Sequence, residues 1–322
     1  MTSLASPGSR SLRWLALLLA LGCASGTGCR RAAPALSTHA FEHNGLNRVY
    51  HLHVPKGHAR NRPAPLVIAL HGGGGTGEKF DWSTNGQVVR EADARGWLVV
   101  FPEGVEKGWN DGRPPLARAD RLRAGVDDVD FLSKLIERVD AEQGVDRARV
   151  YAMGISNGGF MSYRLAIDLA DRIAAVGPVT ASLQKAHERE KPERPVSVMI
   201  VNGTDDPLVP YGGGQVRVLG RDRGEVLSTD DTVKWWRKVN GCTLPAVVRT
   251  LPDADPDDGA RVHVEAHEGC SEGSAVVLYR VEGGGHTWPG GAQYLPRGVI
   301  GGVCRDFDAT RELFDFFAKH RR

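Results

Sequence analysis

The segment from Arg149 to Ala174 constrains the fold of this chain more than any other. Its first part, "RVYAMG" (149–154), has the β-branched and aromatic residues of a buried strand, and residues 158–174 are rich in helix formers. Ser156 stands between them, with a glycine two residues away on either side. Such glycines let a strand and a helix approach closely around a sharp turn. The pattern has two interpretations: a tight turn that needs glycine for its shape, or a serine nucleophile held out for attack.

Strand-like and helix-like segments alternate along the rest of the chain. Strands are expected at 47–55, 64–75, 97–104, 149–154, 174–180, 196–203 and 274–286, and helices at 86–96, 127–144, 158–174, 228–241 and 308–322. This alternation predicts an α/β fold, with a mostly parallel central sheet flanked by helices on both faces. No linker rich in proline or serine divides residues 38–322, so a single catalytic domain is expected there.

Chemically useful groups follow four of the predicted strands, at the sheet edge where α/β proteins carry their sites. They are the glycine run after His71, the Ser156 turn, Asp206 and His286. A serine needs a base such as histidine to become a nucleophile, and the histidine needs a carboxylate to orient it. The order serine, acid, histidine is that of the α/β-hydrolases. Of the neighbouring Asp205 and Asp206, we favour the second because a proline follows it.

The oxyanion of a tetrahedral intermediate needs backbone N–H donors held in place beforehand. In a G-x-S-x-G turn one donor is the residue after the serine, here Asn157, and the other comes from the loop after an earlier strand. That loop is His71–Gly75, and Gly73 is the expected donor. The glycine run lacks the Gly-Lys-Ser/Thr ending of a phosphate-binding loop, which argues against that alternative.

Several longer motifs together resemble one known family. They are "HGGGGTG" (71–77), "GWNDG" (108–112), "VDDVDFLSKLI" (126–136), "RVYAMGISNGGFMSYRLA" (149–166), "NGTDDPLVPYGGG" (202–214), "TVKWWRKVNGC" (232–242) and "GGGHTWPGG" (283–291). The chain from about residue 40 onward is similar to the secreted α/β-hydrolases that include feruloyl esterases, acetylxylan esterases and polyhydroxybutyrate depolymerases. The resemblance implies an exported serine esterase, with Ser156, Asp206 and His286 as its triad and no cofactor. Asn202 departs from the family, which often has histidine there, and is expected to support the loop.

Two other functions stay open at this stage. A serine peptidase could share the fold, although such enzymes usually carry a large additional domain that this chain has no room for. A non-catalytic binding protein could also keep the fold, but such relatives tend to lose the serine or the histidine. The expected partner is therefore a small-molecule or polymer ester, and no basic run indicates nucleic acid.

Some residues have a structural and a functional interpretation of similar weight. Trp109 and Trp288 could line the substrate pocket or could be buried packing. Asp127 and Asp128 begin a predicted helix and are interpreted as carboxylates that cap it. The basic stretch 113–125 could favour anionic or phenolic substrates, although a solvated loop is the simpler interpretation.

The first 37 residues are typical of a leader followed by a linker. Arg10 and Arg13 precede the apolar run 14–21, which is too short to span a bilayer. The following "ALGC" suits signal peptidase cleavage and also resembles a lipobox, in which Cys23 would carry a lipid and tether the protein to a membrane. The protein is therefore expected to be exported, to the periplasm or beyond.

Export gives the cysteines an oxidising compartment. Cys242 and Cys270 flank a predicted hairpin that could bring them together as a disulfide; the alternative is two unpaired small apolar residues. The pairing of Cys29 and Cys304 is left open. No CxxC pair or histidine cluster indicates a metal site.

Overall fold

The structure, a computed structural model, describes residues 36–116 and 118–322. Its centre is a sheet of ten strands. In spatial order these are β1 (Ser37–His43), β2 (Leu46–His53), β4 (Leu98–Pro102), β3 (Ala64–Leu70), β5 (Val145–Ile155), β6 (Ala175–Val179), β7 (Ser197–Gly203), β12 (Val276–Glu282), β11 (Arg261–His267) and β10 (Val247–Thr250). Residues 1–35 of the predicted leader and linker lie outside the described residues, and these include Cys23 and Cys29.

The six central strands, from β4 to β12, are parallel to one another, whereas β1 and β2 at one edge and β11 and β10 at the other are joined to the sheet by antiparallel pairing. Parallel strands need crossover connections, and the helices supply them. The predicted α/β class with a mostly parallel sheet is confirmed. Residues 34–322 form one compact unit.

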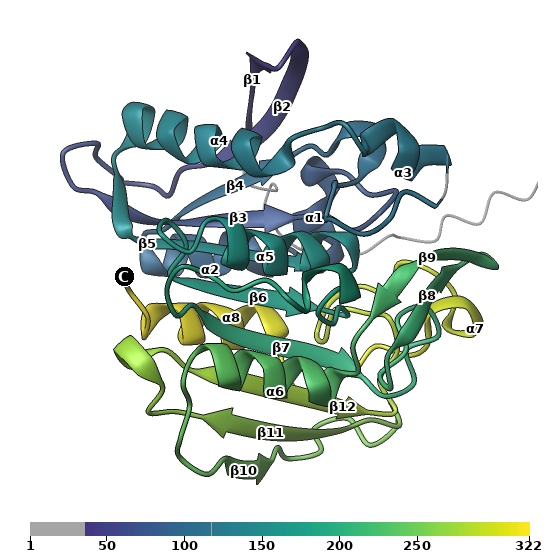
Figure 1. Cartoon of the computed structure of the whole chain (residues 1–322). Coiled ribbons are helices and arrows are strands. Elements are labelled where there is room, and N and C mark those ends of the chain that lie inside the picture. The colour runs from purple at the N-terminus through teal and green to yellow at the C-terminus, as the bar shows by residue number, and fades with distance from the viewer. Residues whose placement is uncertain (1–35, 117) are drawn as a thin grey trace, which may run out of the picture. The chain divides into compact units, whose positions relative to one another are not determined.

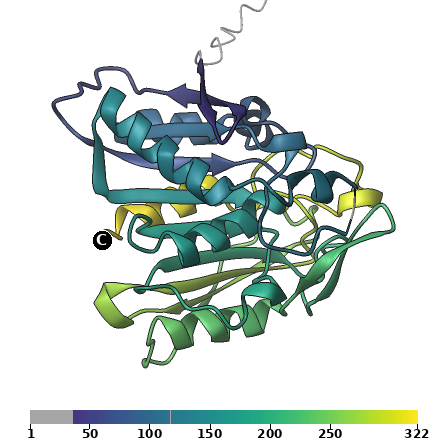
Figure 2. The ribbon, with the colours of Figure 1, turned by 45° about the horizontal axis from the view of Figure 1, so that its top comes forward.

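Helices cover both faces of the sheet (Figures 1 and 2). On one face lie α4 (Asp128–Gln143), α5 (Asn157–Asp168) and α6 (Thr229–Val239); on the other lie α1 (Gly77–Ser83), α2 (Gln87–Arg95) and α8 (Ala309–Ala318). Strand β3 shows why both faces must be covered. Leu66 and Ile68 belong to the core on the α5 side, while Val67 and Ala69 belong to the core on the α8 side. Alternate side chains of a strand point to opposite faces, and here both sets are apolar.

Several elements were not predicted from the sequence: β1, α1, α3 (Arg118–Arg123), β8 (Gly214–Val218), β9 (Arg221–Val226) and α7 (Arg297–Ile300). Strands β8 and β9 pair with each other in a small antiparallel sheet, separate from the large one. In Figure 1 this hairpin, α3 and α7 all lie toward the end of the sheet at which the arrows of the parallel strands point.

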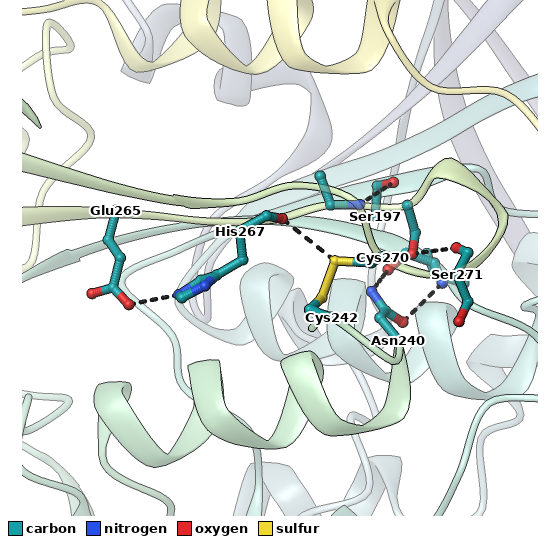
Figure 3. The surroundings of a disulfide bond; sticks show 10 residues. Ser197, Asn240, Cys242, Glu265, His267, Cys270 and Ser271 are labelled. Atoms are coloured by element: carbon teal, nitrogen blue, oxygen red, sulfur yellow. Dashed lines mark hydrogen bonds and ion pairs between the residues drawn. A yellow bond between two sulfur atoms is a disulfide. The ribbon is translucent and has the colours of Figure 1, made fainter. Parts of the chain in front are cut away.

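A disulfide joins Cys242, just after α6, to Cys270, in the turn between β11 and β12 (Figure 3). The side chain of Asn240 holds the same corner, because its Nδ2 donates to the carbonyl of Val196 at 2.7 Å. The hairpin expected between the two cysteines is present as β10 and β11. Cys304 is a buried free thiol.

Membrane-spanning helices are absent from the described part of the chain, since none of its helices is both long and apolar enough.

Candidate active site

Three of the predicted site residues follow strands that lie close together in the sheet. Ser156 comes directly after β5, Asp206 three residues after β7, and His286 four residues after β12. These strands stand in the order β5, β6, β7, β12 and are parallel, so their carboxyl ends share one edge of the sheet. The topology thus brings to one edge of the sheet three residues that follow one another at intervals of 50 and 80 positions in the chain.

The turn that carries Ser156 has a strained backbone. Ser156 has φ 54° and ψ −118°, a conformation that residues with a side chain rarely adopt. Such strain is typical of functional sites and of a serine on a strand-to-helix turn. The neighbouring glycines are required for packing: a Cβ on Gly154 would lie 2.6 Å from the carbonyl oxygen of Leu70, and one on Gly158 would overlap the same carbonyl.

His286 and Asp206 form a buried pair. The Nδ1 of His286 lies 2.7 Å from Asp206 Oδ2, and both side chains are at most 3% exposed. The other carboxylate oxygen of Asp206 accepts two backbone N–H bonds, from Leu208 and Val209, both at 2.8 Å. One carboxylate oxygen of Asp206 therefore faces the backbone of its own turn, and the other faces His286. Asp205, the rejected alternative, is exposed.

The two predicted oxyanion donors lie side by side. A Cβ on Gly73 would be 3.8 Å from the Cβ of Asn157, and one on Gly72 would be 3.6 Å from the Cβ of Ser156. Within the described residues, neither Gly73 N–H nor Asn157 N–H donates a hydrogen bond. Asn157 is the first residue of α5, where backbone N–H groups have no partner inside the helix. Both donors are therefore available to a developing negative charge.

Trp109 links the glycine loop after His71 to the side chain of Asn157. Its indole is 1% exposed and donates from Nε1 to the carbonyl of His71 at 2.9 Å. Its backbone N–H and carbonyl bond the amide side chain of Asn157, at 2.7 and 3.1 Å. Trp109 also lines a cavity of about 250 Å³. Both interpretations of this residue thus have support: the ring packs against the glycine loop, and the residue borders open space.

His71 fixes the start of the glycine loop. Its Nδ1 donates to the carbonyl of Gly72 at 2.8 Å, and its Nε2 accepts from the N–H of Gly104 at 3.0 Å. Burial is the main cause that lowers the pKa of His71 below its usual value. A neutral imidazole suits both hydrogen bonds, because only the neutral form keeps an acceptor nitrogen.

Trp288 packs in the core. Its ring is 1% exposed, meets Phe80 edge to face at 5.4 Å, and donates from Nε1 to Thr310 Oγ1 at 3.0 Å. These contacts favour the packing interpretation over a place in the substrate pocket. Asn202 is also buried, and its side chain bonds both the N–H and the carbonyl of Ala181, in agreement with the expected role in loop support.

Two residues near the site had no recognisable pattern in the sequence. Thr180, at the end of β6, has φ 51° and is 2% exposed; its Oγ1 accepts a hydrogen bond from the N–H of Ser156 at 3.2 Å. Tyr294 donates from its hydroxyl to the carbonyl of His286 at 2.8 Å. Burial and the charge of Asp206 raise the pKa of Tyr294, which keeps that donor protonated.

Asp128 corrects one prediction. Asp127 caps α4 as expected, accepting from the N–H of Asp130, but Asp128 does not cap the helix. It is fully buried, pairs with Arg48 at 2.7 Å and accepts the N–H of Asn110 at 2.7 Å. No group of three or more potential metal ligands gathers in the part of the chain that the structure describes.

Comparison with known proteins adds sequence evidence. Residues 48–207 match the family model "Esterase PHB depolymerase". The chain is 31% identical over 280 residues to the putative esterase NocK of Nocardia uniformis subsp. tsuyamanensis, covering 84% of this chain and 79% of that protein. It is 32% identical to feruloyl esterase B of Piromyces equi, covering 72% of this chain and 41% of that protein. Probable feruloyl esterase C of Aspergillus niger is 27% identical and is covered over 94% of its length.

Solved structures show the same fold. The acetyl xylan esterase from Aspergillus awamori superposes with a TM-score of 0.54 at 14% identity, covering 88% of this chain and 99% of that one. A thermostable esterase superposes with a TM-score of 0.52 at 16% identity, covering 89% and 63%. Identity this low shows a likeness of fold alone, and the α/β-hydrolase fold predicted from the sequence is confirmed.

Proposed function

The chain belongs to the Esterase PHB depolymerase family and is a carboxylic ester hydrolase, and from this premise we propose that Ser156, His286 and Asp206 carry the reaction. The observation that supports the proposal best is the buried pair of His286 and Asp206, on the same sheet edge as the strained Ser156 turn.

In the proposed first step, Ser156 Oγ attacks the carbonyl carbon of the ester while His286 Nε2 takes its proton. The hydrogen bond from Nδ1 to Asp206 stabilises the imidazolium that forms. The negative charge that develops on the carbonyl oxygen receives hydrogen bonds from the N–H groups of Gly73 and Asn157. The alcohol then leaves with the proton from His286, and an acyl group stays on the serine.

The second half of the reaction repeats these roles with water. His286 removes a proton from water, the water attacks the acyl-serine, and Ser156 leaves with the proton. Feruloyl, acetyl-polysaccharide and hydroxybutyrate esters are the substrate classes that the names of the relatives suggest.

The test is hydrolysis of an ester panel by the purified mature protein and by Ser156→Ala. The panel holds p-nitrophenyl acetate and butyrate, methyl ferulate, acetylated xylan and a 3-hydroxybutyrate oligomer. We expect turnover in the wild type and a loss of about 10⁶-fold in kcat in the variant, which is the scale for removal of a catalytic serine. No turnover by folded wild-type protein on any ester would contradict the proposal and favour a peptidase or a binding protein.

We also propose that residues 1–37 direct export and are cleaved or lipidated at Cys23. The apolar run 14–21 and the small residues before Cys23 support this. Mass spectrometry of the protein from cells would show a chain that begins at Cys23, with or without a diacylglyceryl group. An intact Met1 in the mature protein would contradict the proposal.

A further inference from the structure

The cavity beside Trp109 has an unusual lining. Its volume is about 250 Å³, which is the volume that about eight water molecules occupy in liquid water. Three arginines line it, Arg113, Arg123 and Arg223, together with two carboxylates, Asp111 and Asp120. The first two arginines come from the basic stretch for which a solvated loop was the simpler interpretation, yet Arg123 is only 9% exposed.

The two carboxylates do not balance the three guanidinium groups. Asp111 is paired with Arg113, whose Nη2 donates to it at 2.7 Å. Asp120 is shared: Arg123 Nη2 donates to it at 2.6 Å and Arg223 Nη1 at 3.0 Å. The lining therefore carries one more positive than negative charge. In addition, Arg123 Nε and Arg113 Nη1 are buried and have no acceptor within the described residues. The described residues thus supply fewer acceptors here than these side chains have donors.

Two residues of the cavity wall, Trp109 and Asp111, bond the side chain of Asn157. A Cβ on Gly108 would lie 2.8 Å from Asn157 Oδ1 and 2.9 Å from Arg123 Cζ, so these two side chains flank the same glycine. Asp111, on the cavity wall, accepts from Asn157 Nδ2 at 2.6 Å. Asn157 directly follows Ser156. A substrate whose ester carbonyl sits at the serine could therefore place another group in the cavity.

We propose that this cavity is a subsite for a carboxylate carried by the ester substrate. This inference rests on the proposed function, since it names the class of ester that the same site prefers. A carboxylate would supply the missing negative charge and would accept hydrogen bonds from guanidinium groups, which match its geometry well. The carboxylate could belong to the acyl part or to the alcohol part of the ester.

The experiment compares acids with their neutral amides, which have nearly the same size. The acyl arm uses 4-nitrophenyl hydrogen glutarate and 4-nitrophenyl glutaramate, after subtraction of the uncatalysed rates. The alcohol arm uses 3-acetoxybutyrate and 3-acetoxybutyramide, followed by acetate release. We expect wild-type kcat/KM to favour the acid by at least about tenfold in one arm, the scale of one charge-assisted hydrogen bond.

Arg223→Gln tests the origin of this preference. Arg223 lies on the β8–β9 hairpin and shares Asp120, so its loss leaves the lining neutral. We expect the ratio of acid to amide to fall about tenfold. The matched control is Arg217→Gln on the same hairpin, whose partner is the exposed Asp222 and which is absent from the cavity lining. The control should keep the wild-type ratio and the wild-type activity.

The outcomes separate the two proposals. If the wild type hydrolyses the amides and the acids equally well, or if Arg223→Gln keeps the wild-type ratio, the carboxylate subsite is wrong and the esterase function stands. If the wild type hydrolyses none of the four esters or of the neutral panel, the proposed function fails first. The wild-type ratio needs no variant, so the proposal can be overturned even if Arg223→Gln does not fold.

Discussion

Two segments beside the candidate site are held in place by different means. The nucleophile turn (residues 154–159) is shaped by its own sequence, because its glycines permit contacts with Leu70 that a Cβ would prevent. The Trp109 loop (residues 104–111) lies next to it and has one 3-10 turn, Val105–Lys107, as its regular structure. Side chains from distant elements bond its backbone, including Asn157 at Trp109 and Asp128 at Asn110. The conformation of the first segment depends on its own glycines, and the conformation of the second depends on hydrogen bonds from other elements.

The end of the Trp109 loop shows this dependence most clearly. The carbonyl of Asp111 accepts from Gln184 Nε2 at 2.9 Å and contacts His187 Nε2 at 3.0 Å. The carbonyl of Asn110 accepts from Arg164 at 2.6 Å. Gln184 and His187 come from one short segment and Arg164 comes from α5, all more than 50 residues from the bonds they make in the loop. We therefore expect substitutions in the nucleophile turn to destabilise it through steric overlap. The Trp109 loop should instead be displaced when its remote polar partners are removed.

The largest effect is expected from Asp128→Asn. This change removes the charge that compensates Arg48, and both side chains are almost completely buried. Breaking a buried ion pair by removing one partner typically costs about 3–5 kcal/mol. Chemical denaturation should show that loss in the free energy of unfolding. The matched control is Asp127→Asn, one residue away: asparagine caps helices as well as aspartate does, so a change below about 0.5 kcal/mol is expected. If Asp128→Asn costs no more than this control, the buried ion pair with Arg48 does not contribute the expected stability.

Gly158→Ala tests the locally encoded segment. The new Cβ would overlap the carbonyl of Leu70, and both groups belong to backbone that cannot move aside freely. Overpacking of this kind costs about 1–3 kcal/mol or more, which would lower the melting temperature measured by circular dichroism. Gly298→Ala is the control, because a Cβ there meets nothing within 4 Å. If Gly158→Ala were as stable as the control, the turn would accommodate the added Cβ, and the predicted steric overlap would be wrong.

The same division explains what could be predicted from the sequence. The sheet, most of its helices and the positions of Ser156, Asp206 and His286 after neighbouring parallel strands follow from periodicity and from turns after strands, which are local patterns. The role of Asp128 was missed because a carboxylate at a helix start looks like a cap, and Arg48 is 80 residues away. The burial of Arg123 was missed for the same reason. Its environment depends on Asp120 and on how the loop folds against Gly108.

Asn157→Ala tests the contact between the two segments. The variant keeps the backbone N–H proposed as an oxyanion donor but removes three side-chain bonds to the Trp109 loop and Asp111. A misplacement of about 1 Å in a catalytic site can cost about 10²-fold in rate, and we expect kcat to fall on that scale. Ser162→Ala on the same helix is the control, since it removes only a bond to the carbonyl of Gly158 and should change kcat less than twofold. Equal kcat values in the two variants would mean that the Trp109 loop keeps its place without Asn157.

The smallest effect is a pH dependence of stability that comes from His71. Because its pKa is lowered in the folded protein, mainly by burial, the unfolded chain binds the proton first as the pH falls. Stability from this group is complete above the unfolded pKa of about 6.5 and is lost as the pH falls toward the folded pKa, by at most about 1.4 kcal/mol per pH unit.

Urea denaturation at several pH values between 8 and 5 would measure this slope. Among the nearby charges, Glu103 and Asp128 raise the pKa of His71 and Arg123 lowers it. In His71→Gln the slope should be shallower than in the wild type. His320, whose pKa burial lowers to about 4, contributes to both proteins alike and cancels in the difference. Parallel slopes would mean that the folded protein binds a proton at His71 as readily as the unfolded chain does, so that the bond from the Gly104 N–H is not needed to keep the glycine loop in place. The Trp109 loop would then depend less on its distant partners than the hydrogen bonds indicate.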